Sequence, residues 1–279
     1  MIRHRSYAVP LTAVLLALAT GVALGAGPLT DTGSNASPAP RVVTQAPGST
    51  YSDTFAAWVA SDLYRSGLSR RPVAFVTLPG ADPATVASLT AQVKAAGSYA
   101  VDPQLVDAQQ KSLVDTLGIQ LAKQVRGTTS KAATTYPRIG QLLAVAVANR
   151  TNAAGQPDDD VTAVRQSLAA AKLVSMPEGV PPTAPLVLVV LGDPVDQTMA
   201  DGLLEGLAHG ARGVVAVAPT RDTVLAALHT DGVTRHVTTV DGSETNAGRV
   251  AAVLGLIRAW AKPGGAFGAS GSDGAAPLG

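Results

Sequence analysis

The side chains that bind soft metal ions are few in this sequence. It contains no Cys, so thiolate metal sites, disulfides and Cys nucleophiles are all excluded. Thioether and imidazole ligands must then come from three Met and four His. The full set is Met1, Met176, Met199, His4, His209, His229 and His236.

Two of these histidines are placed where they could act together. His229 and His236 flank a predicted turn, so their rings could approach each other. Met199 and His209 share a predicted helix, but at ten residues apart they point in different directions. His229 and His236 are thus the candidate metal ligands, but ordinary surface or helix-capping histidines explain them better.

Acidic residues cluster at three positions where oxygen ligands could gather. Asp158, Asp159 and Asp160 suggest a cation site, but they lack the spaced oxygens and the glutamate of a calcium loop. A solvated loop that caps the next helix explains them better. Residues 192–194 (GDP) and 241–244 (DGSE) each follow a predicted strand, at the edge where parallel sheets place ligands. A turn that caps a helix accounts for the same residues.

Motifs for the common catalytic chemistries are missing from the sequence. It has no GxxxxGK[ST], GxGxxG, GxSxG or HExxH pattern. Its net charge is +1 and charges of both signs are spread along the chain, which argues against a nucleic-acid partner. We therefore expect that the protein is not an enzyme, and we assign it no cofactor. A catalytic site built from scattered residues is the alternative.

Short apolar runs alternate with helical patterns after residue 71, and this order is typical of βα units. Such units build a mainly parallel sheet with helices on both faces, so we predict an α/β/α sandwich. The expected strands are 73–78, 99–101, 186–191, 213–217 and 236–240. The expected helices are 83–96, 106–125, 139–148, 161–171, 197–208, 220–228 and 245–260, after a first helix near 55–63 capped by Ser52 or Asp53.

The N-terminus has the pattern of a membrane segment. Arg3 and Arg5 precede residues 9–27, which carry no charge, and as a helix this run is about 28 Å long, close to the thickness of a bilayer core. Basic residues stay on the cytoplasmic side, so the rest of the chain is expected outside. The alternative is a cleaved signal peptide ending near Ala23-Leu24-Gly25. The residues expected within the membrane include Val9, Leu15, Leu16, Leu18, Gly21 and Gly25.

Composition divides the chain into five parts. Residues 1–8 form the basic cytoplasmic start and 9–27 the transmembrane helix. A linker rich in Pro, Ser and Thr follows over 28–50. The extracytoplasmic α/β domain is expected over 51–262, and 263–279 are expected to be a disordered tail.

Four stretches of the sequence resemble one protein family. They are VPLTAVLLALATGVALG (9–25), PVAFVTLPGAD (72–82), IGQLLAVAVAN (139–149) and TTVDGSETNAGRVAAVLGLI (238–257). The last is the most specific, with Val240-Asp241 and Gly248-Arg249 before an apolar helix. Together they resemble the actinobacterial copper transport protein family, the MctB family.

That resemblance implies a cell-envelope protein in copper homeostasis or efflux, with copper as the transported or sensed ion. Some relatives in the family act instead as scaffolds that partner a membrane protein in cell division, so self-association and a membrane-protein partner are both open. The sequence departs from the family in one respect. A charged heptad coiled coil usually follows the membrane helix, whereas this chain has its Pro/Ser/Thr linker there.

Overall fold

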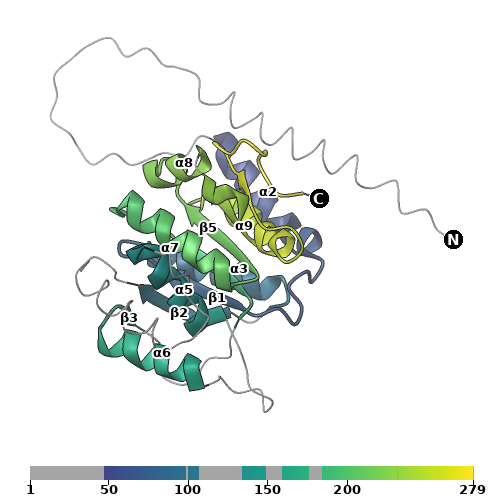
Figure 1. The fold of residues 1–279 in the computed structure, drawn as a ribbon. Coiled ribbons are helices and arrows are strands. Elements are labelled where there is room, and N and C mark those ends of the chain that lie inside the picture. Colours follow the sequence, from purple (N-terminus) through teal and green to yellow (C-terminus); the bar gives the residue numbers. More distant parts are fainter. Residues whose placement is uncertain are drawn as a thin grey trace, which may run out of the picture.

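A seven-stranded sheet forms the centre of the domain (Figure 1). The computed structural model describes residues 47–98, 100–106, 134–148, 159–175, 184–230 and 232–278. The strands run in the order β3-β2-β1-β4-β5-β6-β7 across the sheet. Their bounds are β1 Val73–Thr77, β2 Ala100–Val106, β3 Val174–Ser175, β4 Leu186–Val190, β5 Gly213–Ala218, β6 Val237–Asp241 and β7 Gly265–Phe267.

The sheet is parallel except at one edge, where the two-residue β3 runs antiparallel to β2. The chain moves outward from β1 to β2 and β3, then returns to the other side of β1 to add β4 to β7 in sequence. This is the doubly wound order, in which the direction of winding reverses between β1 and β4. The predicted mainly parallel α/β fold is confirmed.

Helices cover both faces of the sheet, as parallel strands require (Figure 1). Two separate apolar clusters, one on each face, join the helices to the strands. One face carries α5 Thr135–Ala148, α6 Asp159–Ala170, α7 Gln197–Gly210 and α8 Thr223–Thr230. The other carries α2 Pro47–Tyr64, α3 Pro83–Ala95 and α9 Asn246–Ala259.

The central strand β4 shows how the two clusters are divided. All five of its residues are buried. Val187 and Val189 join the cluster under α5 and α7, whereas Leu188 and Val190 join the cluster under α3 and α9. The alternation follows the two-residue period of a strand, so one apolar run supplies both cores.

Helices α5 and α7 approach each other backbone to backbone. A Cβ added at Gly140 of α5 would lie 2.3 Å from the carbonyl oxygen of Leu203, and one at Gly206 of α7 would lie 2.1 Å from that of Pro137. Gly202 and Gly210 extend the same contact, giving α7 three glycines at a spacing of four residues. At each of these glycines, a side chain larger than hydrogen would collide with the facing helix.

The N-terminal boundary of the domain differs from the prediction. Helix α2 begins at Pro47, inside the expected linker 28–50. Asp53 therefore lies within the helix and is not its cap. Its carboxylate instead accepts a hydrogen bond from the backbone N–H of Asn246, at the start of α9.

Residues 263–279, expected to be a disordered tail, are instead part of the fold as far as the structure describes them. Gly265–Phe267 forms β7, which completes the edge of the sheet beside β6. The expectation was wrong because Gly and Ser suggested disorder, whereas here Gly268 adopts a φ of 108° and turns the chain back over the sheet edge.

The predicted membrane segment 9–27 lies outside the described residues, and so does the helix predicted near 106–125, except for Val106, which is the last residue of β2. Within the described part of the chain, no helix has the length and apolar character needed to cross a membrane.

The central position of β4 leads to a stability prediction. Val190→Asp would place an unpaired charge where the native side chain is 2% exposed, so we expect a loss of about 4 kcal/mol or more in the free energy of unfolding. Thermal and urea denaturation followed by circular dichroism would measure it. Ala91→Asp, on the exposed surface of α3, is the matched control and should cost less than about 1 kcal/mol. Equal stability of the two variants would contradict the central position of β4.

Candidate functional site

The crevice where doubly wound folds usually bind ligands lies between the loops that follow β1 and β4. Here those loops contact each other directly. A Cβ added at Gly192 would lie 1.8 Å from the carbonyl oxygen of Pro79, and one at Gly80 would lie 2.4 Å from that of Asp193. Backbone atoms therefore fill the crevice, and no space for a nucleotide is left between the two loops.

The helix N-termini along the same edge of the sheet are each occupied by a side chain of the chain itself. Asp82 caps α3, Asp196 caps α7 and Thr245 caps α9. At the start of α8, the carboxylate of Asp222 accepts the backbone N–H of Leu225 at 2.7 Å. These four caps take the N–H groups that would otherwise bind a phosphate.

The Asp82 cap also places a negative charge at the start of α3. Its carboxylate accepts hydrogen bonds from the hydroxyl and backbone N–H of Thr85 and from the N–H of Ala84. These bonds, those of Thr85 first, lower the pKa of Asp82, so it is negatively charged at neutral pH. A fixed negative charge at this helix start repels a phosphate.

The turn after β6 holds the C-terminal segment. Asp241 is 2% exposed, and its carboxylate accepts the backbone N–H groups of Ala269 and Ser270 and, at 2.5 Å, the hydroxyl of Ser270. The Ser270 hydroxyl also lies 3.2 Å from Nδ1 of His229. Aspartate, serine and histidine meet here, but the serine bonds to the aspartate. The histidine therefore has no carboxylate to orient it, as the base of a catalytic triad requires.

The rest of this turn is fixed by Gly248 and Arg249. A Cβ at Gly248 would lie 2.0 Å from the carbonyl oxygen of Gly242. The Arg249 guanidinium donates to the carbonyl oxygens of Ser243 and Glu244 at 2.9 and 2.8 Å. The 241–249 stretch that dominates the family resemblance is therefore a structural lock between β6, α9 and the C-terminal segment.

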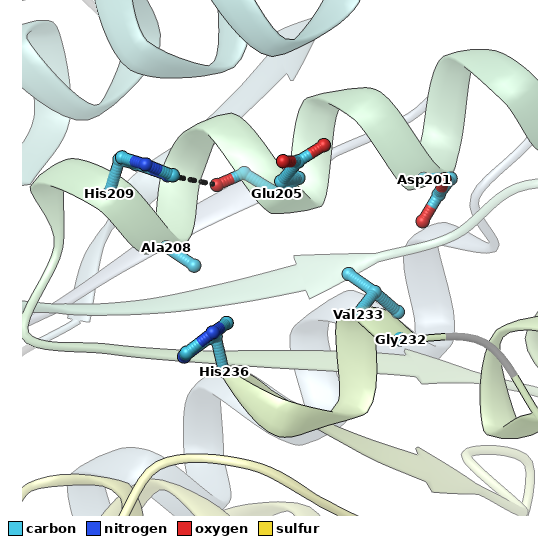
Figure 2. A pocket seen from close by; sticks show the side chains of 7 residues that line it. All are labelled: Asp201, Glu205, Ala208, His209, Gly232, Val233 and His236. Atoms are coloured by element: carbon cyan, nitrogen blue, oxygen red, sulfur yellow. Dashed lines mark hydrogen bonds between the residues drawn. The ribbon is translucent and has the colours of Figure 1, made fainter. Parts of the chain in front are cut away.

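A surface hollow of about 490 Å³ between α7 and the 3-10 helix η1 (Gly232–Arg235) is lined by two histidines and two carboxylates (Figure 2). Asp201, Glu205 and His209 lie four residues apart on α7 and so share one helix face. His236 reaches the hollow from the opposite wall. Figure 2 shows the two histidines toward one end of the hollow and Asp201 toward the other.

His209 is oriented by its own helix. Its Nδ1 lies 3.2 Å from the backbone carbonyl oxygen of Glu205 (Figure 2). In the tautomer that donates to this carbonyl, Nε2 keeps a free lone pair, which is the arrangement found in metal-binding histidines. No three His, Asp or Glu side chains, however, come within metal-binding range of one another in the described residues.

The histidines chosen from the sequence have different neighbours in the structure. His229 lies beside Ser270 with its Nε2 buried and without a partner, while His236 lines the hollow with His209. The pairing of His236 with His209 was missed because their separation of 27 residues carries no local signal. Met199 is 3% exposed and belongs to the core.

The other candidate positions are also accounted for. Asp159 and Asp160 form the first turn of α6, the position expected of acidic residues that cap a helix. Asp193 does not cap α7, contrary to the sequence interpretation, because the chain continues to Asp196 before the helix starts. Met1, His4, Met176 and Asp158 lie outside the described residues.

The fold and these sites define a doubly wound α/β protein whose nucleotide crevice is filled by its own backbone. The chain belongs to the MctB family, because the family model described as "Copper transport outer membrane protein, MctB" matches residues 1–278. The family gives it a copper-related role in the cell envelope. No curated protein matches the chain closely enough to count as a relative.

The filled crevice can be tested by substitution. Gly192→Ala would drive a Cβ into the Pro79 carbonyl, and we expect a loss of about 3 kcal/mol in the free energy of unfolding as the two loops are forced apart. Gly232→Ala is the control, because a Cβ there meets nothing within 4 Å. Denaturant unfolding of both variants would measure the difference. Wild-type stability of Gly192→Ala would show that the crevice is open.

Proposed function

We propose that this protein is a membrane-anchored component of copper homeostasis or efflux that acts within an assembly in the cell envelope. The observation that carries the proposal is the family match over nearly the whole chain. Copper is then its cargo or signal. The uncharged segment 9–27 supports a single membrane anchor, with the α/β domain on the extracytoplasmic side.

The arrangement of soft ligands supports an indirect role in copper handling. Tight copper(I) sites hold two or more soft side chains together in the fold. In the described residues, Met199 is buried in the core, His229 faces the C-terminal segment, and only His209 and His236 share a hollow. Transport by this chain would therefore depend on a partner or on self-assembly.

A non-enzymatic scaffold for another envelope membrane protein is the second candidate function. The filled crevice and the four capped helix N-termini favour it, because they remove the sites where this fold binds small ligands. A deletion strain separates the two candidates. Copper hypersensitivity supports the first, whereas a division defect with normal copper tolerance supports the second.

The proposed topology predicts where a C-terminal reporter works. An alkaline phosphatase fused after residue 278 should be active, since it would lie outside the cytoplasm, and a cytoplasmic fluorescent reporter should be dark. The full-length protein should stay with membranes through a high-salt wash. Recovery of a soluble protein that starts near Ala26 would show that the N-terminal segment is a cleaved signal.

The ligand arrangement predicts weak copper binding. In a competition with a copper(I) chelator, the purified full-length protein should lose its copper to the chelator, as adventitious sites do. His209→Ala and His236→Ala together should remove most of the remaining weak binding, and His229→Ala should have little effect. A stoichiometric site that survives the competition and disappears in the His229→Ala/His236→Ala variant would overturn this view.

A further inference from the structure

Helix α2 exposes aromatic side chains to solvent. Tyr51 is 72% exposed and Trp58 is 77% exposed, and the other exposed large hydrophobic residue of the described chain, Leu278, is 38% exposed. Phe55 lies between them on the same face, with its ring centroid 6.3 Å from that of Trp58. Such exposure of large aromatic residues points to a surface that is covered in the working protein.

The exposed face of α2 carries no charge along this stretch. Ala56, Ala60 and Tyr64 are buried and attach the helix to the core on its other side. Asp53 is the one charged residue between Tyr51 and Trp58, and its carboxylate accepts the N–H of Asn246 at the start of α9. The outward face is therefore aromatic from Tyr51 to Trp58, ahead of the exposed Asp62 one turn further on, and we define Tyr51, Phe55 and Trp58 as the aromatic stripe.

The residue types of the aromatic stripe suit the boundary between lipid and water. Tyrosine and tryptophan combine an apolar ring with a hydrogen-bonding group, and both are enriched at membrane interfaces. A second protein copy fits less well, since three side chains on one helix cover far less than the roughly 800 Å² per partner of a stable dimer.

The position of α2 in the chain also favours the membrane. Residues 28–46, between the proposed membrane segment and α2, are 19 in number. The sequence predicts a linker there, and a flexible chain of that length has a root-mean-square reach of about 24 Å. Helix α2 is the first described element after the proposed anchor, and it packs beside α9 (Figure 1).

We propose that the aromatic stripe of α2 rests on the lipid surface and seats the α/β domain against the membrane. The proposal rests on the membrane anchor of the proposed function. It adds a second contact, which fixes the orientation of the domain: α2, which packs over the buried α9, faces the bilayer, while α5, α6 and α7, on the opposite face of the sheet, point away from it.

The two tryptophans of the chain allow a matched test. Trp58 belongs to the aromatic stripe. Trp260 instead contacts two arginines, with the Cζ atoms of Arg71 and Arg212 at 4.6 and 4.2 Å from the centroid of its ring. Full-length protein would be reconstituted into phosphatidylcholine vesicles with bromine at shallow or deep acyl positions. The Trp260→Phe variant keeps Trp58 as its one tryptophan, and we expect its emission to be blue-shifted and to be quenched most strongly by shallow bromine. The Trp58→Phe variant keeps Trp260, and we expect its emission not to be quenched.

A second pair of variants removes any dependence on the tryptophan substitutions. Because the chain has no Cys, Thr54→Cys on the exposed turn of the stripe and Ala163→Cys on α6, on the opposite face of the sheet, can each be labelled with a polarity-sensitive dye. The dye at 54 should report an apolar environment in vesicles and the dye at 163 an aqueous one.

The outcomes separate the surface contact from the anchor. An unquenched Trp58 in protein that withstands a high-salt wash would overturn the surface contact and leave the anchor standing. Release of the protein by the wash would overturn both. Emission from Trp58 that shifts with protein concentration in lipid-free micelles would identify a second copy as the occupant and overturn the proposal.

Discussion

Contact between backbones, made where glycine leaves room for it, is the constraint on which this structure depends. Gly192 lies against Pro79, Gly206 against Pro137 and Gly248 against Gly242, each closer than any side chain would permit. With 4% aromatic residues and no Cys, the chain has few bulky side chains and no disulfides with which to build a core. It brings its elements closer together instead, so that Ala, Val and Leu suffice to fill both faces of the sheet.

The same contacts decide what the fold can do. A doubly wound sheet offers a ligand crevice where its winding reverses and anion sites where its helices start. Here backbone atoms fill the crevice. The helix N-termini are occupied by the side chains of Asp82, Asp196, Asp222 and Thr245. The usual ligand-binding positions of this architecture are therefore closed in this domain. The copper-related role of the family directs attention instead to the surfaces of the domain and to the envelope components around it.

The fold was largely predictable from the sequence because its signals are local. The run LVLVVL identified the central strand β4, and the alternation of apolar runs with helical periods identified the parallel sheet. The order of strands and the pairing of His209 with His236 were not predictable, since both depend on contacts between residues far apart in sequence. The glycine spacing of α7 was a local signal, visible at 202, 206 and 210, whose meaning became clear only with α5 in place.

The C-terminal segment supplies contacts that the sheet needs to be complete. Until residues 265–267 have been made, β6 presents an unpaired edge, and until 269–270 arrive the Asp241 carboxylate has none of the partners that the finished structure gives it. A chain that emerges N-terminus first would thus complete its sheet only after residues 265–270 have been made. A chain that is truncated before this segment would carry an open strand edge and an unsatisfied charge. Features of this kind expose incomplete proteins to quality-control proteases and chaperones.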